Sequence, residues 1–292
     1  MSSFRSRNCA GAVNNPTRRR LAKAGLAALS LALPFRAGSR ELPSIAGVVW
    51  QLHANTPDAR GSWHRLGARE LIVQWTAVDG VAFIPGTGMR EAPRMPDWKR
   101  IAKEPWAERV VVGLSGRFDE QTTRRSLDAM LAESLAITRL GFPFQVSGWY
   151  FPAEVDPHWK EAPKVLPPVL AKLPRPLWIT IYDTDNIGAE RYASWIASFM
   201  PRDVQVLFQD SVGVGVRDAA AARVYADALA ARLGKQRIAI EVEAFRTERG
   251  KFRPATAAEL RAQLPAFGGY PLYLFDGPHY VSDRVVDQLL AP

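Results

Sequence analysis

Residues 238–246 read IAIEVEAFR, a short run in which apolar side chains alternate with two glutamates. A period of two is typical of a β-strand, because successive side chains of a strand point to opposite faces. The isoleucines, Val242 and Ala244 form one apolar face, while Glu241 and Glu243 lie on the other. A buried carboxylate is costly unless it is hydrogen-bonded, paired or protonated. The run therefore predicts a strand with an apolar layer on one side and a polar interior on the other.

Apolar runs of strand length recur along the chain and alternate with segments of helical pattern. Strands are predicted over 45–52, 70–76, 109–114, 144–150, 177–182, 204–209, 237–245 and 271–275. Helices are predicted over 96–107, 120–140, 165–173, 189–200, 217–233, 257–264 and 283–290. Strands that alternate with helices and are mostly apolar indicate a parallel sheet covered by helices.

An open, doubly wound sheet would show the same alternation as a closed barrel. Its nucleotide-binding forms carry a glycine fingerprint after the first strand, whereas this chain has QLHANTPDARGSW at 51–63. The glycine-containing SVGVG at 211–215 follows the sixth strand and lacks a Walker lysine, so a flexible loop is favoured over a phosphate cradle. Eight strands in residues 40–292 match a (β/α)8 TIM barrel of the α/β class, a single domain.

The N-terminal 39 residues have the composition of an export leader. Consecutive arginines precede the uncharged AGLAALSLALP, which is too short to span a bilayer. The segment resembles the twin-arginine (Tat) signal, and the matching positions are Thr17, Arg18, Arg19, Leu21 and Lys23. The other interpretation is a basic tail followed by a surface helix. The leader interpretation predicts a signal peptide over 1–39, cut after Ser39, and a barrel domain over 40–292. The Tat machinery would be its partner in export, and the mature protein would be periplasmic or secreted with no membrane span.

Loss of the leader changes the charge and cysteine arguments. The whole chain carries +9, and residues 1–39 hold seven Arg and Lys but no Asp or Glu, which leaves +2 for residues 40–292. This weak charge gives no support to a nucleic-acid-binding function. The single cysteine, Cys9, lies in the leader, so the mature chain would have neither a disulfide nor thiol chemistry.

Polar and aromatic residues gather where the predicted strands end, which is the face that carries active sites in such barrels. Glu154 is expected just beyond the end of the fourth strand, and Glu243 near the barrel mouth on the seventh. Both are catalytic candidates, with Glu241 one layer deeper as a support. The candidates for substrate binding are Trp50, Gln51, Gln74, Trp75, Tyr150, Tyr182, Gln209, Asp210, Glu241 and Asp276.

Paired carboxylates with aromatic walls suit the cleavage of glycosidic bonds. One acid protonates the departing oxygen, while the other attacks the anomeric carbon or activates water. The substrate class predicted for this chain is accordingly a polysaccharide or oligosaccharide, with no cofactor. Each acid also has a structural interpretation: Glu243 as the partner of Arg246 or Arg217, and Glu154 as an exposed loop acid.

The strand-end segments also carry a family resemblance. The placement of Glu154 and Glu243 resembles that of the large clan of retaining glycoside hydrolases built on (β/α)8 barrels. GWYFPAEVD, LFQDSVGVG, EVEAFR and YLFDGPHY look like segments of the bacterial family DUF4434 of glycoside-hydrolase-like barrels, over about residues 44–290. The resemblance implies Glu154 as acid/base and Glu243 as nucleophile. Ala153 stands where the clan usually has an asparagine that binds the sugar, and Gln209 or Asp210 are the candidates to replace it.

Two other functions compete with hydrolysis. An inactive barrel that binds a glycan in an envelope or exopolysaccharide system is favoured by Ala153. A metal-dependent deacetylase or phosphodiesterase would need clustered His and Asp ligands. The four histidines are dispersed along the chain, so no metal site is predicted.

Overall fold

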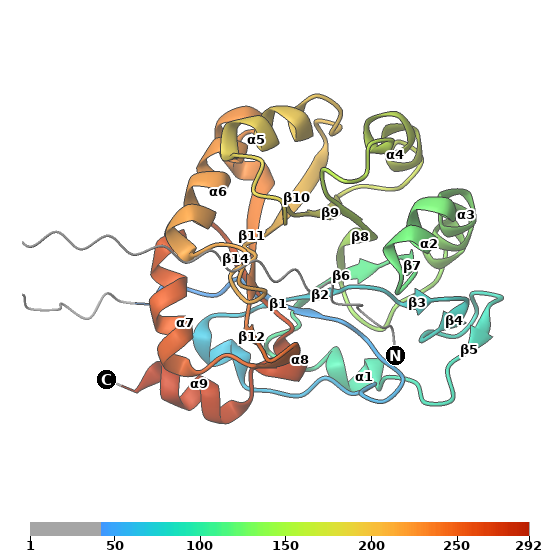
Figure 1. Ribbon diagram of the computed structural model, residues 1–292. Helices are drawn as coiled ribbons and strands as arrows, with labels where there is room; N and C mark the ends of the chain where they lie inside the picture. The colour runs from blue at the N-terminus through green and yellow to red at the C-terminus, as the bar shows by residue number, and fades with distance from the viewer. Residues whose placement is uncertain (1–41, 292) are drawn as a thin grey trace, which may run out of the picture. The chain divides into compact units, whose positions relative to one another are not determined.

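The computed structural model describes residues 42–291, which form a closed barrel of eight parallel strands (Figure 1). In chain order the barrel strands are β1 (Gly47–Trp50), β2 (Glu70–Val73), β6 (Arg109–Gly113), β8 (Val146–Val155), β9 (Leu177–Ile181), β10 (Val204–Gln209), β11 (Ile238–Glu243) and β14 (Leu272–Phe275). Each pairs with its neighbours in the ring, and β1 closes the ring against β14. The predicted TIM-barrel fold is therefore confirmed, together with the position of every predicted strand.

The two faces of the strands carry different apolar clusters. A small cluster fills the barrel interior and consists of Val49, Ile72, Val111, Tyr150, Leu207, Ala239 and Tyr273. A much larger one joins the outer faces of the strands to the helices, and Ile238, Ile240 and Val242 of β11 belong to it. Glu241 shares the inner face with Ala239, because side chains two residues apart point the same way. The predicted separation of the two faces of 238–246 is therefore confirmed.

Helices follow most of the strands and surround the barrel (Figure 1). They are α1 (Trp98–Ile101), α2 (Glu120–Arg125), α3 (Leu127–Ile137), α4 (Ala162–Leu170), α5 (Ala189–Ala197), α6 (Ala219–Leu233), α7 (Ala257–Gln263), α8 (Gly277–Tyr280) and α9 (Asp283–Leu290). A 3₁₀ helix, η1 (Trp63–Leu66), lies between β1 and β2.

The predicted helix over 120–140 is wrong as a single element. Asp119 caps α2 as expected, accepting a hydrogen bond from the Thr122 amide. Ser126 then leaves the helical conformation, with φ −111° and ψ 14°, and α3 begins at the next residue. The break leaves α2 as a short separate helix at the end of the chain segment that follows β6.

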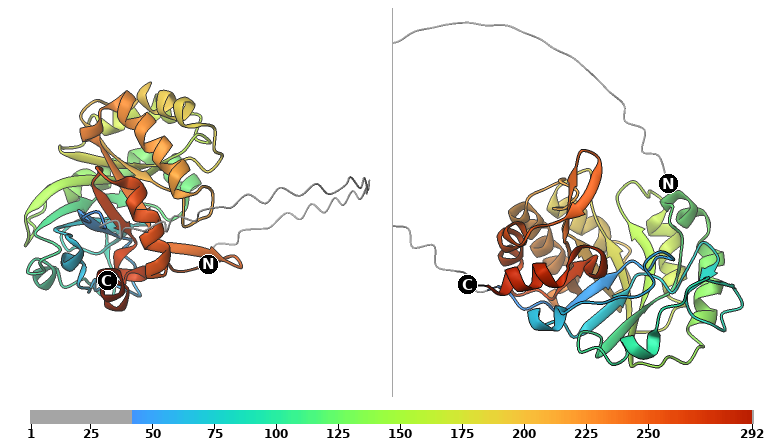
Figure 2. Two further views of the ribbon diagram at one scale, coloured as in Figure 1. Left: turned by 90° about the vertical axis from the view of Figure 1, so that its left-hand side faces the viewer. Right: turned by 90° about the horizontal axis from the view of Figure 1, so that it is seen from below.

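Two additions extend the barrel. Four two-residue strands form a small sheet: β3 (Ala77–Val78), β4 (Val81–Ala82), β5 (Arg90–Glu91) and β7 (Ser115–Gly116). An antiparallel hairpin of β12 (Phe245–Glu248) and β13 (Lys251–Pro254) directly follows β11, and Figure 2 shows it in orange, projecting from the rest of the fold. Both additions continue from the carboxyl ends of barrel strands.

Within residues 42–291, no helix is both long enough and apolar enough to cross a membrane. The leader predicted over 1–39 lies outside the described residues.

Candidate functional site

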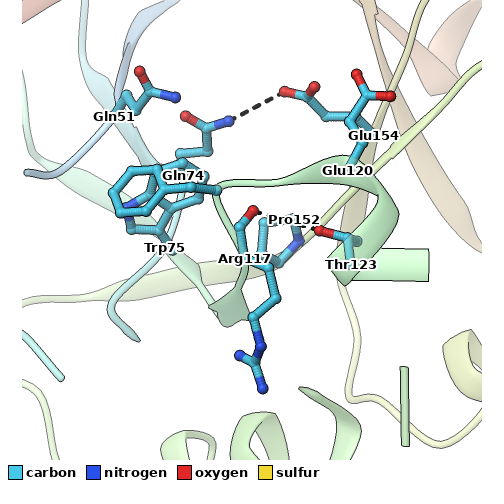
Figure 3. Close-up of a pocket in the computed structure, with 9 residues that line it drawn as sticks. Gln51, Gln74, Trp75, Arg117, Glu120, Thr123, Pro152 and Glu154 are labelled. Carbon is cyan, nitrogen blue, oxygen red and sulfur yellow. Dashed lines mark hydrogen bonds between the residues drawn. The ribbon is translucent and has the colours of Figure 1, made fainter. Parts of the chain in front are cut away.

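A pocket of about 70 Å³ opens at the carboxyl end of the barrel strands (Figure 3). Gln51 and Gln74 follow the last residues of β1 and β2, and Glu154 is the penultimate residue of β8. The complete lining is Gln51, Gln74, Trp75, Arg117, Phe118, Glu120, Thr123, Pro152 and Glu154. The pocket lies on the face where barrels of this class hold their active sites.

Glu154 lies inside a strand, not in the loop that was predicted beyond it. β8 continues to Val155, with a register irregularity between Phe151 and Val155 against β9. A bulge of this kind redirects side chains and is frequent next to active sites. Ala153 packs in the layer between barrel and helices, whereas Glu154 lines the pocket. The alternative of an exposed loop acid is therefore wrong.

The Glu154 carboxyl group is partly withdrawn from water and lies near other acids. Burial raises its pKa to about 7, and the charges of Glu120 and Asp156 contribute to the rise. Its Oε1 accepts a hydrogen bond of 3.2 Å from Gln74 Nε2, drawn as a dashed line in Figure 3. A carboxyl group with this pKa is still partly protonated at pH 7, as a proton donor must be.

Gln74 offers a further polar atom to the pocket. Its side chain is only 3 % exposed, and its Oε1 is buried without a partner among the described residues. A buried acceptor that lacks a partner is unfavourable, which makes this end of the Gln74 side chain a costly feature of the pocket wall. Trp75 lies next to Gln74, and its ring meets that of Phe118 edge to face with centroids 5.1 Å apart. One wall of the pocket is therefore aromatic and the other carries carboxyl and amide groups.

A second polar cluster lies deeper in the barrel, around Glu241. The Thr180 hydroxyl donates to Glu241 Oε2 at 3.1 Å, and Tyr150 in turn donates to Thr180 at 2.8 Å. Gln209 Nε2 donates to Glu241 Oε1 at 3.4 Å. Burial, and then the charge of Glu154, raise the pKa of Glu241. Glu241 therefore lies within electrostatic reach of Glu154 at the pocket wall, and its supporting role stays a prediction.

Glu243 occupies a separate environment and does not line the pocket. Its side chain is 4 % exposed, and its Oε2 accepts a hydrogen bond of 2.9 Å from the Val214 amide. Burial, and then Asp210, raise its pKa. Among the described residues, no arginine lies within ion-pair distance of its carboxylate, so the structural interpretation of an Arg246 or Arg217 pair is wrong.

The SVGVG segment at 211–215 forms the cover over Glu243. A Cβ on Gly213 would lie 2.6 Å from the Phe245 carbonyl oxygen and 2.7 Å from the Glu243 Cβ, so the close approach requires glycine. Asp210 holds the start of this loop by accepting from the Val212 amide at 3.1 Å, and it also accepts from the Glu243 amide at 3.3 Å. Asp210 is fully buried. Its hydrogen bonds stabilise the loop, and it does not line the pocket.

Asp276 is linked to the pocket by a hydrogen bond to the lining residue Gln51. Its Oδ2 accepts from the Gln51 amide at 2.9 Å and contacts His279 Nδ1 at 2.6 Å. The other ring nitrogen of His279 lies 2.6 Å from the Thr56 hydroxyl. Asp276 therefore fixes the backbone of a pocket residue, and its remaining oxygen is buried without a partner among the described residues.

The structure gathers part of the predicted set and separates the rest. Gln51, Gln74, Trp75 and Glu154 meet in the pocket, whereas Trp50 is fully buried on the helix side of β1 and packs against Trp98 with centroids 5.9 Å apart. Alternation along β1 explains this, since Val49 points inward. Trp50 therefore has no path to a ligand in the pocket.

Sequence reasoning missed the wall that the segment after β6 provides. The missed residues of this segment are Arg117, Phe118, Glu120 and Thr123, and Pro152 of β8 was missed as well. Glu120 was part of a predicted helix, although it follows soon after the end of a barrel strand, where such folds place site residues. The position of Glu120 soon after a barrel strand was therefore the sequence feature that could have identified it as a site residue.

Metal ligation has little basis here. Within residues 42–291, His, Cys, Asp and Glu side chains form no group of three that could hold an ion.

The comparisons with known proteins identify a family and nothing finer. A family model described as "Domain of unknown function (DUF4434)" matches residues 61–271, and no curated protein and no solved structure matches the chain.

Proposed function

The chain belongs to the DUF4434 family, and on that premise we propose that it is an exported glycoside hydrolase-like enzyme that cleaves or remodels a polysaccharide. The family description names no activity, so the proposal rests on the pocket. Its mechanism would use two carboxyl groups, with Glu154 as the proton donor.

The observation that carries the proposal is Glu154 at the pocket wall with a pKa of about 7. An acid that is still protonated near neutral pH can give its proton to a departing glycosidic oxygen. Gln74 orients the carboxyl group through its hydrogen bond to Glu154 Oε1. Glu154 would thus supply the proton, and Gln74 would orient the Glu154 carboxyl group toward the substrate.

The size of the pocket limits the ligand that it could hold. A volume of about 70 Å³ is well below the roughly 300–1,000 Å³ of sites that enclose a drug-sized ligand. The pocket would therefore take one end or one substituent of a glycan, and the rest of the polymer would lie across the open face. Trp75 and Phe118 offer apolar surface for stacking against a sugar ring.

A glycan-binding barrel without catalysis is the second candidate. The observation in its favour is Ala153, which packs in the outer layer and leaves the pocket without the amide that related hydrolases have before their acid. Gln74 is the amide in contact with Glu154 instead. Under this alternative the pocket would bind a sugar and leave its bonds intact.

One experiment separates the two candidates. Wild type and Glu154→Gln are tested for binding on a glycan array and for release of reducing ends from the glycans bound. The hydrolase proposal expects cleavage by wild type and a loss of about 10²-fold or more in kcat for the variant, with binding retained. Binding without cleavage by wild type would establish the second candidate, and equal cleavage by both proteins would remove Glu154 from the mechanism.

Export forms part of the proposal. The twin-arginine pattern in residues 17–23 supports passage through the Tat machinery, with a periplasmic or secreted mature protein that meets its polysaccharide or oligosaccharide outside the cytoplasm.

A further inference from the structure

The pocket contains a second carboxyl group that the sequence patterns did not single out. Glu120, the first residue of α2, lines the pocket together with Glu154, and Figure 3 shows the two in the same region of the wall. Glu243 is absent from this lining and is covered by the 211–215 loop. Any two-carboxylate reaction in the pocket therefore has Glu120 as the acid available beside Glu154.

Glu120 is held in place from two sides. The Tyr182 hydroxyl donates to Glu120 Oε1 at 2.5 Å, and Arg124 donates to Oε2 at 3.1 Å. Tyr182 follows β9 and is 7 % exposed, so its hydroxyl has a fixed position. Donors on both oxygens, one of them cationic, are the environment that suits an ionised carboxylate. The Glu120 side chain still keeps 49 % of its surface exposed, so water reaches it.

Electrostatics couple Glu120 to Glu154. After burial, Glu120 is the largest cause of the raised pKa of Glu154, and Asp156 is the next. Glu243 is not among those causes. The charge of Glu154 also acts on Glu241, below it in the barrel, and on Tyr150 and Tyr182. Two carboxyl groups in one site with different surroundings, one buried and the other hydrogen-bonded by Tyr182 and Arg124, are the arrangement that divides acid and base roles.

We propose that Glu120 is the second catalytic carboxylate, acting as the general base in the same pocket as the proton donor Glu154, with Tyr182 as its positioning residue. The inference rests on the proposed glycoside hydrolysis. The Glu154 proton passes to the glycosidic oxygen as the bond from that oxygen to the anomeric carbon breaks, and the electron pair of the bond leaves with the oxygen. A water molecule adds its oxygen to the anomeric carbon and gives a proton to Glu120, so one water is consumed for each bond cleaved.

The first test measures catalysis with a panel of 4-nitrophenyl glycosides. Glu120→Ala is expected to lower kcat by about 10²-fold to 10⁴-fold, and sodium azide is expected to restore cleavage by attacking in place of the activated water. Asp128→Asn, an exposed acid on the adjacent helix α3, is the matched control and keeps wild-type rates. Undiminished kcat in Glu120→Ala, or a loss that azide does not restore, overturns the catalytic role.

The second test does not depend on turnover. Carbon-13 NMR of glutamate-labelled protein follows the Glu154 carboxyl group, assigned by its absence in Glu154→Gln. Glu120→Gln is expected to lower the titration midpoint of Glu154 by roughly one pH unit, because a neighbouring negative charge is removed. Glu243→Gln is expected to leave that midpoint unchanged.

The two tests keep the inference separable from the function on which it rests. If wild type cleaves glycosides and Glu120→Ala does so equally well, the function stands and the inference fails. If wild type cleaves none of the panel, the proposed hydrolase fails, and so does the role of Glu120 in it. The NMR result then shows whether the acid pair exists: an unchanged Glu154 midpoint in Glu120→Gln removes the pair as well.

Discussion

Glu154 illustrates at the scale of one residue how a buried carboxyl group lowers stability once it ionises. The fold removes its carboxyl group from water and places it near Glu120 and Asp156, all of which disfavour ionisation. Gln74 is the only hydrogen-bond partner that the described residues offer its side chain. The proton-donor role proposed for Glu154 and its unfavourable ionisation in the folded state thus rest on the same arrangement.

The first prediction concerns the pH dependence of stability. The folded-state pKa of Glu154, about 7, lies above its unfolded value of about 4.5, so its favourable contribution is complete below pH 4.5 and is lost as pH rises through 7. Glu154→Gln does not titrate and is expected to exceed wild type at pH 8 by up to about 3 kcal/mol, since one pKa unit corresponds to about 1.4 kcal/mol.

Urea unfolding of both proteins between pH 4 and pH 8 measures this difference. Glu161→Gln, which removes an exposed carboxylate, is the control and should follow wild type throughout. A stability difference for Glu154→Gln that is independent of pH would show that the raised pKa is wrong.

At the scale of elements, the packing of the loop at 211–215 requires a glycine at position 213. Val214 satisfies the Glu243 carboxylate through its amide, and this requires the loop to lie almost in contact with β11. Gly213 makes the contact because any side chain there would meet the Phe245 carbonyl oxygen, a backbone atom that cannot rotate away. The loop is thus part of the packing of the seventh strand.

The second prediction is that Gly213→Ala destabilises the fold by about 1–3 kcal/mol, since the added Cβ forces a backbone shift and weakens the Val214 hydrogen bond. Gly141→Ala is the matched control. A Cβ at that position meets no atom within 4 Å, so its effect should stay within about 0.5 kcal/mol. Equal midpoints of the two variants in urea would contradict the proposed role of Gly213.

The elements also show which parts of the fold and the site could be predicted from the sequence. The strands, and the inward direction of Glu241, follow from local alternation of apolar and polar residues, so they were predictable. The same rule, applied to β1, would have placed Trp50 outward. The break of the 120–140 helix at Ser126 and the path that carries Glu120 to the pocket depend on tertiary packing, which no local pattern specifies.

On the scale of the whole molecule, charge is distributed unevenly along the chain. Residues 1–39 contain seven of its basic residues and no acidic ones, and residues 40–292 carry +2. A basic, acid-free segment in front of a nearly neutral domain is the composition expected of an export leader. The polysaccharide proposal needs only the second part, because sugar binding depends on pocket groups and not on net charge.

The third prediction tests the leader. Arg18→Lys together with Arg19→Lys keeps the charge unchanged and is expected to hold the uncut precursor in the cytoplasm, since the twin-arginine pattern is recognised by its arginines. Cell fractionation and the mass of the recovered protein measure the outcome. The control pair Arg5→Lys and Arg7→Lys lies outside the pattern and should be exported, and export of both doubles would refute the Tat assignment.

The closure of the ring also has a consequence for biosynthesis. β1 and β14 pair Gly47 with Tyr273, so the first strand receives its second neighbour from the last strand to leave the ribosome. Until then the nascent chain exposes an unpaired parallel edge, which is a template for association with other chains. The barrel of this domain can therefore close only after β14 has been synthesised, and the edge of β1 stays open to other chains until β14 pairs with it.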